Sequence, residues 1–225
     1  MRILRIAPGE HYHIFNRAIN KQTIFHNFND YVRFLFLIIY IQSPVKVLHI
    51  SRIVKDLEKY CTGQSRALAT GYEEKIIKKR VVELVSFCIM PNHFHSMVKE
   101  LEEGGMADYM QRVLTAYSKY YNTKYEKSGH VFQGPYRAVH VEDNEQLLHL
   151  SAYIHRNPRE LSEWFRKEDK YPWSSYKDCI EKNRWGELLR PDILMGEFKD
   201  RKDYDKFVKT SKAKIFEEEF FCLDV

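Results

Sequence analysis

The stretch from Val81 to Met90 restricts the fold of this chain more than any other feature. Its ten residues (VVELVSFCIM) are mostly apolar and rich in β-branched side chains. A run of this length and composition, closed by Pro91-Asn92, predicts a buried strand that ends in a tight turn. The residues from His93 to Glu100 are then expected to return as the antiparallel partner strand.

Strand-like and helix-like segments alternate on both sides of this hairpin. Tyr12–Phe15 predicts a strand, and Asn27 or Asn29 is expected to cap a helix that runs to Ile41. The further expected elements are short helices over 51–60 and 72–79, a long helix from Asp108 to about Tyr125, a strand over Val131–Val141, and a helix capped by Asp143 or Asn144 and ended by Pro158. This order predicts an α+β fold, a split βαβ antiparallel sheet with helices mainly on one face.

Composition limits the partners and the cellular compartment that we expect for this chain. The 225 residues carry 36 Lys and Arg against 31 Asp and Glu, a net charge of +5, which is compatible with a nucleic-acid partner without proving one. The longest apolar stretch, Phe34–Ile41, has eight residues and is too short to span a bilayer. The four cysteines are scattered, and no signal peptide is recognisable. We therefore expect free thiols and a cytoplasmic protein.

Residues 112–137 combine positive charge with aromatic side chains. Arg112, Lys119, Lys124 and Arg137 lie in this stretch, where the only acidic residue is Glu126. Cations interleaved with aromatic rings suit single-stranded nucleic acid, because cations contact phosphates and rings stack on bases. An amphipathic helix with a solvated basic face is the alternative interpretation.

The pair His93 and His95 is the first candidate for chemistry. On a strand, side chains at i and i+2 point to the same face, so both imidazoles can reach one metal ion. The pattern by itself is weak, because His11-Tyr12-His13 repeats it. The residues around the pair therefore decide whether the pattern indicates a metal site.

The segment Cys88–Val98 (CIMPNHFHSMV) resembles the signature of the REP-associated tyrosine transposases and the insertion-sequence single-tyrosine transposases of the HUH nuclease superfamily. The likeness extends, in the family's order, over roughly residues 10 to 180. The other matching segments are Tyr12–Arg17 (YHIFNR), Asp30–Leu35 (DYVRFL), Gly129–Arg137 (GHVFQGPYR), Tyr153–Pro158 (YIHRNP) and Tyr171–Tyr176 (YPWSSY).

The resemblance implies particular roles for four residues. It implies the ferredoxin-like HUH endonuclease fold, with His93 and His95 as metal ligands and Tyr153 as the nucleophile. It implies Asn157 as a third, oxygen-bearing ligand. Residues at i and i+4 of a helix lie on one face about 6 Å apart, so Tyr153 and Asn157 can serve one site. Nothing in the sequence alone singles out Tyr153 among the 15 tyrosines.

The implied reaction is cleavage and rejoining of single-stranded DNA. A phenol, with a pKa of about 10, is a poor nucleophile at neutral pH and is helped by a divalent cation on the phosphate. Attack by Tyr153 would leave a 5′-phosphotyrosine and a free 3′-OH, so strands can be rejoined without ATP. Two imidazoles suit Mn²⁺ better than Mg²⁺, and we expect either to act as the cofactor.

The resemblance also implies the partner and the domain plan. The expected substrate is single-stranded or hairpin DNA, bound by a monomer or a homodimer. The residues expected to contact DNA are Arg17, Arg112, Lys119, Lys124, Arg137 and Arg156. Residues 1–180 are expected to form the transposase domain with an insertion at about 42–72, and residues 181–225 a C-terminal extension that is a charged helix or a mobile tail.

Two more histidines have open interpretations. His13 lies near the metal if its strand is the sheet neighbour of the His93–Glu100 strand. His155 either supports the site from the helix that carries Tyr153, or is solvated or packed like an ordinary histidine.

Three other functions compete with transposition. A domesticated relative would bind hairpin DNA as a regulator without cutting it, although nothing would then require His93, His95, Tyr153 and Asn157 together. A replication initiator or relaxase of the same superfamily usually carries a larger partner domain or a second tyrosine. A hydrolase of small phosphate esters would need more acidic ligands beside the histidine pair.

Overall fold

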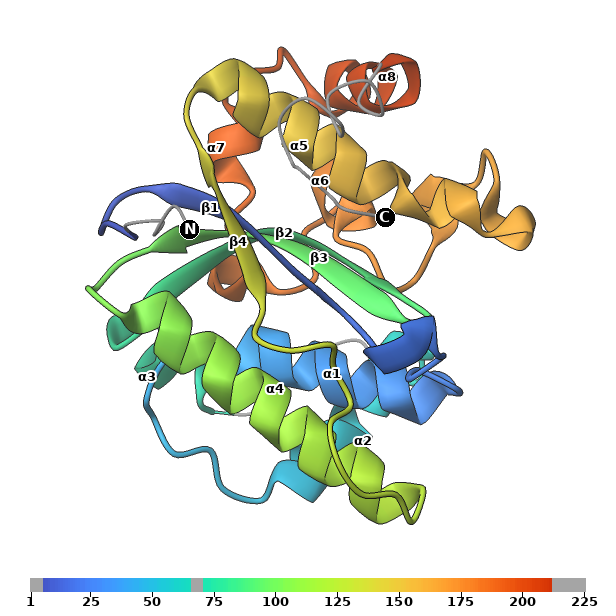
Figure 1. Cartoon of the computed structure of the whole chain (residues 1–225). Helices are drawn as coiled ribbons and strands as arrows, with labels where there is room; N and C mark the ends of the chain where they lie inside the picture. Colours follow the sequence, from blue (N-terminus) through green and yellow to red (C-terminus); the bar gives the residue numbers. More distant parts are fainter. Residues whose placement is uncertain (1–5, 66–70, 212–225) are drawn as a thin grey trace.

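A four-stranded antiparallel sheet in the order β2-β3-β1-β4 forms the centre of the computed structural model, which describes residues 6–65 and 71–211 (Figure 1). The strands are β1 (His11–Arg17), β2 (Val82–Met90), β3 (His93–Glu100) and β4 (Arg137–Val141). The main helices are α1 (Phe28–Tyr40), α2 (Ile50–Cys61), α3 (Glu73–Lys78), α4 (Gly105–Lys124), α5 (Asn144–Arg156), α6 (Tyr176–Ile180), α7 (Asp192–Met195) and α8 (Arg201–Thr210).

The predicted α+β class and the split βαβ order are confirmed. β2 and β3 form the hairpin, with Met90 opposite His93. β1 lies between β3 and β4 and is antiparallel to both, so that Phe15 is opposite His95 on one side and Arg137 on the other. The first strand of the chain is therefore the direct neighbour of the strand that carries the histidine pair.

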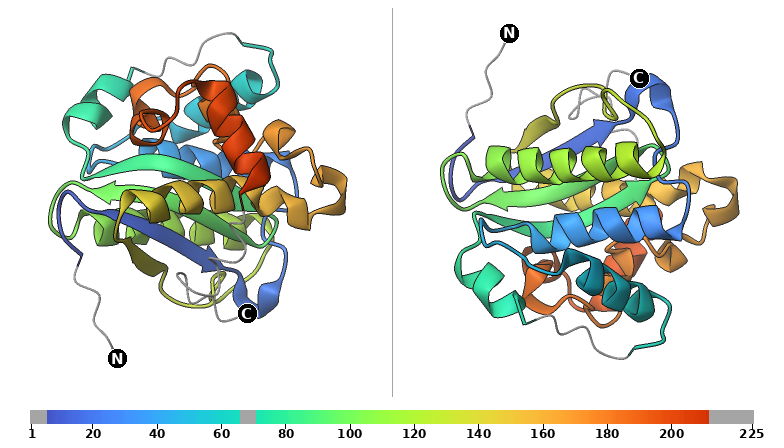
Figure 2. Two further views of the ribbon diagram at one scale, coloured as in Figure 1. Left: turned by 90° about the horizontal axis from the view of Figure 1, so that it is seen from above. Right: turned by 90° about the horizontal axis from the view of Figure 1, so that it is seen from below.

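Helices cover both faces of the sheet, whereas the sequence predicted cover mainly on one. Figure 2 shows α5 and α8 over one face and α1 and α4 across the other. The physical reason lies in β2 and β3, where nearly every side chain on both faces is buried. Two buried faces need two covering layers.

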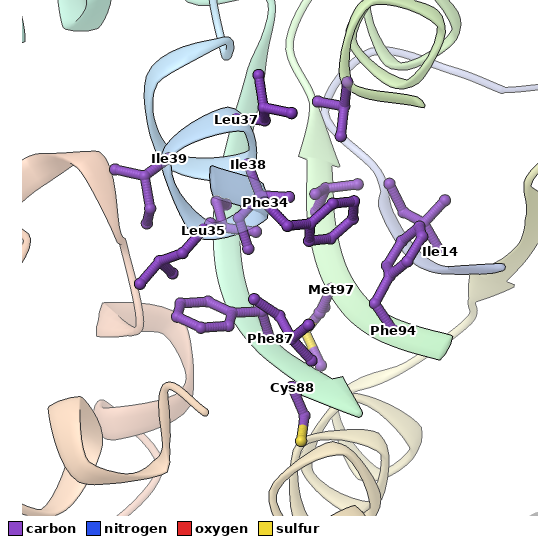
Figure 3. Packing of buried hydrophobic residues seen from close by; sticks show 14 of the residues in the cluster. Ile14, Phe34, Leu35, Leu37, Ile38, Ile39, Phe87, Cys88, Phe94 and Met97 are labelled. Atoms are coloured by element: carbon purple, nitrogen blue, oxygen red, sulfur yellow. The ribbon is translucent and has the colours of Figure 1, made fainter. Parts of the chain in front are cut away.

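Alternation along β3 separates the core from the site. Phe94 points toward α1, where its ring lies 5.0 Å from that of Phe34 (Figure 3). Ile14 of β1 is buried and lies beside Phe94 in the same view. His93 and His95 therefore point to the opposite face, toward α5.

Two helix starts agree with the caps expected from sequence. The Asn27 side chain accepts a hydrogen bond from the Asp30 amide, and the Asp30 carboxylate accepts one from the Asn27 amide, which makes a capping box at the start of α1. The Asp143 side chain accepts from the Gln146 amide at the start of α5. The α5 helix then ends at Arg156, two residues before Pro158.

The α4 helix begins three residues before the predicted Asp108. The buried carboxylate of Glu100 accepts a 2.7 Å hydrogen bond from the Met106 amide and thereby satisfies the helix start from outside. Gly105 packs directly on Val81, so the helix needs a residue without a side chain at this point. Both partners come from other elements, which local sequence did not reveal.

The predicted strand over 131–141 is interrupted. Only Arg137–Val141 is regular strand, and the earlier part keeps one isolated bridge between Ala18 and Phe132. Gly134 has φ of +154° and Pro135 lacks an amide hydrogen, so the ladder cannot continue through them. The interruption leaves residues 133–135 beside the histidine pair.

The segments outside the common core pack against it. In the stretch interpreted as an insertion, α2 lies on α1. In the expected C-terminal extension, α8 packs on α5 and α6 and buries Tyr204 and Val208, while residues 212–225 lie outside the described part. The division of the chain near residue 180 stays a prediction. Within the described residues, no helix is both long and apolar enough to cross a membrane.

Gly105→Ala should lower the free energy of unfolding by about 1–3 kcal/mol, because overpacking forces the backbone to shift. A Cβ at this position would lie 2.5 Å from the Val81 carbonyl oxygen. Urea denaturation measures the change. Gln111→Ala on the exposed side of α4 is the control and should stay within about 0.5 kcal/mol of wild type. Equal stabilities for all three proteins would contradict the packing argument.

Candidate active site

A cavity of about 680 Å³ opens where β1 and β3 meet the end of α5. It collects side chains from four separate parts of the chain. Its lining comprises Phe15, Asn16, Arg17, His93, Phe94, His95, Gln133, Gly134, Pro135, Arg137, Tyr153, Asn157 and Glu160. The four residues expected to carry the chemistry, His93, His95, Tyr153 and Asn157, are all among them.

Strand and helix geometry bring these four residues together. His93 and His95 project from one face of β3, and their ring centroids are 5.1 Å apart. The ring of Tyr153 stands edge-on to that of His95, with centroids 5.2 Å apart. Asn157 follows one helical turn later. All four side chains are nearly buried, which gives the site a low dielectric and fixed side-chain positions.

Asn92 determines where the proton of His93 resides. The Asn92 side-chain nitrogen donates to the Lys21 carbonyl at 2.9 Å, so its oxygen faces the His93 ring. That oxygen lies 2.6 Å from His93 Nδ1 and can only accept a hydrogen bond. His93 therefore carries its proton on Nδ1.

Asn157 is oriented in the same way from the other side. Its Nδ2 donates to the Tyr153 carbonyl at 3.0 Å, which turns Oδ1 toward His93 Nε2 at 3.4 Å. Burial, together with the nearby charge of Arg17, lowers the pKa of His93 to about 4, so its Nε2 has no proton at neutral pH. Two lone pairs thus face each other without a hydrogen between them.

A cation placed between these lone pairs would convert their repulsion into ligation. The donor set, imidazole nitrogen with amide oxygen, suits Mn²⁺ and accommodates Mg²⁺ less well. In residues 6–65 and 71–211, no three His, Cys, Asp or Glu side chains group into a metal site. The amide oxygen that the resemblance implies as a third donor, Oδ1 of Asn157, lies 3.4 Å from His93 Nε2.

His95 has a second histidine behind it. Its Nδ1 lies 2.9 Å from Nε2 of His13, and the two rings are stacked 5.1 Å apart. His13 comes from β1 and is fully buried. Burial lowers the pKa of His13 to about 3, and burial with the neighbouring charges places the pKa of His95 well below its usual value. Both rings are neutral at pH 7.

His155 lies on the same helix as Tyr153 but points away from the cavity. It is fully buried between Ser175, at 2.9 Å from Nε2, and Tyr204, at 2.7 Å from Nδ1. These contacts join α5 to α6 and α8. Burial lowers the pKa of His155 to about 3. Of its two interpretations, the packed histidine agrees with these contacts.

The expected DNA contacts are dispersed over the molecule. Arg17 and Arg137 line the cavity, and Lys119 lines a neighbouring groove beside α4. Lys124 forms a 2.6 Å ion pair with the buried carboxylate of Asp30. The remaining two, Arg112, which donates to the Ser43 carbonyl, and Arg156, which is half-buried, lie outside the cavity lining.

Most aromatic residues of α4 serve the core instead of an open surface. Tyr117 and Tyr121 are buried, and the hydroxyl groups of Tyr120 and Tyr125 contact Asp30 at 2.9 and 2.6 Å. Of the two interpretations of this stretch, the amphipathic helix therefore describes these tyrosines better than a stacking surface for bases does. The aromatic residues recur with the period of a helix, and packing of one helix face against the core is enough to explain that spacing.

Comparisons with known proteins identify the family and the fold of this chain. A family model described as IS200-like transposase matches residues 42–157, more than half of the chain. The chain belongs to this transposase family. The matched span contains His93, His95, Tyr153 and Asn157. A search of the curated proteins finds no match.

One solved structure supports the fold assignment for this IS200-like transposase. It is a REP-associated tyrosine transposase bound to a REP hairpin, with a TM-score of 0.50 and 14% sequence identity. The alignment covers 86% of this chain and 92% of that one. At this identity the likeness establishes the fold alone, and it agrees with the family resemblance read from the sequence.

Sequence reasoning missed the supporting residues of the site. Asn92 was interpreted only as part of a turn, and Glu160 was not considered as lining. The position of Asn92 directly before the histidine pair is a usable signal, because a short amide side chain there can reach the adjacent imidazole. The neighbourhood of Glu160 depends on the turn that follows α5, which the sequence does not specify.

The stability of this protein should fall in mild acid. The pKa of His155 is about 3 when folded and about 6.5 when unfolded, so unfolding takes up a proton below pH 6.5. The stabilising contribution is complete above pH 6.5 and is lost as pH falls toward 3, at about 1.4 kcal/mol per pH unit. Urea denaturation at pH 7.5 and 5.5 measures this slope, which His155→Phe should reduce.

Tyr204→Phe is the matched control for this experiment. It removes a hydroxyl that contacts His155 but keeps the titrating ring, so it should lower stability similarly at both pH values. If His155→Phe retained the full wild-type slope, His155 would not be a buried neutral histidine.

Proposed function

We propose that this IS200-like transposase is a metal-dependent single-stranded DNA endonuclease and strand-transferase that cuts at hairpin-associated sites. Tyr153 is the nucleophile, and His93, His95 and Asn157 hold Mg²⁺ or Mn²⁺. The observation that carries the proposal is the convergence of a tyrosine with the unprotonated His93 Nε2 and Asn157 Oδ1 in one buried cavity. The REP hairpin bound by the related solved transposase supports hairpin DNA as the partner.

The chemical step exchanges one phosphodiester bond for another. The phenolic oxygen of Tyr153 attacks phosphorus, the bond from phosphorus to the 3′-oxygen breaks, and the phenol gives up one proton while the leaving 3′-oxygen takes up one, so no net proton is released. The products are a 5′-phosphotyrosine ester and a free 3′-OH. Because the ester retains the bond energy, a 3′-OH can attack it and restore a DNA strand while Tyr153 regains its proton. A bound divalent cation supplies charge stabilisation on the phosphate oxygens.

The chain's own residues hold the phosphate and exclude water. Arg17 and Arg137 place two guanidinium groups in the cavity lining. Glu160 contributes a carboxylate to the same lining. Guanidinium pairs with phosphate oxygens through two parallel hydrogen bonds, which orients the phosphate as well as attracting it. Burial of Tyr153 beneath β1 and β3 limits competing attack by water.

Tyr153→Phe should abolish covalent attachment to DNA while hairpin binding is kept. The experiment incubates each protein with labelled single-stranded hairpin oligonucleotides and Mn²⁺, and resolves the products on a denaturing gel. Wild type should give a protein–DNA adduct and a cut strand, and the variant should give neither. Electrophoretic mobility shift measures the retained binding.

The other functional classes predict different gels. Cleavage by both proteins without an adduct would contradict the tyrosine mechanism and indicate activation of water. Binding without cleavage by wild type would favour the domesticated hairpin-binding regulator. Tyr12→Phe is a matched control, because this tyrosine is also buried in the sheet region but lies outside the cavity lining. It should retain adduct formation.

Arg17→Ala and Arg137→Ala should each weaken single-strand binding and flatten its salt dependence. Each lost phosphate contact changes the slope of log K against log salt by about 0.7. Fluorescence anisotropy between about 50 and 200 mM salt measures both quantities. Lys202→Ala, an exposed cation on α8, should leave the slope unchanged. Unaltered slopes for both arginine variants would remove them from the DNA interface.

A further inference from the structure

His13 is a buried histidine outside the His93/His95 pair, and it contacts one of these two proposed metal ligands directly. Its Nε2 lies 2.9 Å from Nδ1 of His95, and no part of its side chain is exposed. The contact crosses from β1 to β3, the two central strands of the sheet. In the register of these strands, His13 is opposite Met97 and Phe15 is opposite His95, so the histidine contact is diagonal.

One hydrogen bond can have two directions here, and only one suits a metal ligand. If His13 donates from Nε2, His95 accepts at Nδ1 and must carry its own proton on Nε2. The cavity-side nitrogen would then have no lone pair. If His95 donates from Nδ1, its Nε2 is left with a lone pair for the cation.

We propose that His13 is a positioning residue that accepts the Nδ1 hydrogen of His95 and thereby keeps His95 Nε2 available for a divalent cation. The metal-binding role of this contact rests on the proposed function. The direction of the hydrogen bond from His95 to His13 does not, because it exists in the metal-free protein as well. The contact gives His13 the part that Asn92 plays for His93. Each histidine of the pair thus has a dedicated acceptor behind it.

The surroundings of His13 favour this role. The ring is stacked on His95 at an interplanar angle of 20° and contacts Phe15, with ring centroids 4.8 Å apart, so it cannot rotate freely. A neutral imidazole has one ring nitrogen that can accept a hydrogen bond, and the fully buried ring of His13 presents its Nε2 to His95 Nδ1 at 2.9 Å. Partners of this kind fix the tautomer and the orientation of a ligating histidine and raise its basicity.

The first measurement is the tautomer of His95 in metal-free protein. Long-range ¹H–¹⁵N NMR distinguishes Nδ1–H from Nε2–H imidazole, and the His95 signal is assigned by its loss in His95→Gln. Wild type should show the Nδ1–H form. His13→Phe keeps a ring of similar size without an acceptor and should shift His95 toward the Nε2–H form. His13→Gln offers an amide oxygen and should restore the wild-type tautomer.

The second measurement is Mn²⁺ affinity, followed by electron paramagnetic resonance or calorimetry without DNA. His13→Phe should bind Mn²⁺ about 10- to 100-fold more weakly, whereas His13→Gln should stay within a few-fold of wild type. His155→Phe removes another fully buried histidine that lies outside the cavity lining, and it should not change the affinity. Thermal melts of all variants separate loss of folding from loss of the site.

The outcomes distinguish this inference from the proposed function. An Nε2–H tautomer in wild type, or unchanged tautomer and affinity in His13→Phe, would overturn the role of His13. An Nδ1–H tautomer that depends on His13 in a protein with no measurable Mn²⁺ binding would uphold the positioning contact and overturn the metal site. If His13→Phe does not fold, the tautomer in wild type and His13→Gln still decides.

Discussion

Alternation of side chains along β3 is the constraint on which the rest of this structure depends. Phe94 faces α1 and takes part in the core, while His93 and His95 face α5. A shift of one residue in register would exchange these faces, burying two imidazoles among apolar side chains and exposing a phenylalanine. The apolar layer against α1 therefore determines which way the histidine pair faces.

Two backbone carbonyls fix the orientation of the two amide side chains beside His93. The Lys21 carbonyl orients Asn92 and the Tyr153 carbonyl orients Asn157, each by accepting the amide hydrogen of the side chain. Both amide oxygens consequently point at His93, one at each ring nitrogen. One receives a hydrogen bond, and the other faces a lone pair. The cation of the proposed function would join these two atoms, and their geometry is the observation that supports that proposal.

The sequence predicted those helices and strands well whose start and end depend on residues within or next to the element itself. The hairpin from Val82 to Glu100 and the caps at Asn27 and Asp143 belong to this group. Errors arose where a partner from elsewhere intervenes. Glu100 and Val81 set the start of α4, and two buried faces of one hairpin required helices on both sides of the sheet. The aromatic residues of 112–137 kept two interpretations, DNA stacking and an amphipathic helix, because their helical spacing suits a core and a stacking surface equally.

The sequence by itself determined the buried hairpin from Val82 to Glu100 and, through the resemblance of its short motifs, indicated the family and the four candidate residues His93, His95, Tyr153 and Asn157. Without that resemblance nothing singles out Tyr153 among the 15 tyrosines. Only the tertiary structure decided which side chains support those four. It placed His13 against His95, Asn92 and Asn157 on the two nitrogens of His93, and paired Lys124 with Asp30 away from the cavity. These contacts depend on strand register and side-chain orientation between segments up to about a hundred residues apart in the sequence. Contacts between such distant segments produce no periodic pattern from which the sequence could predict them.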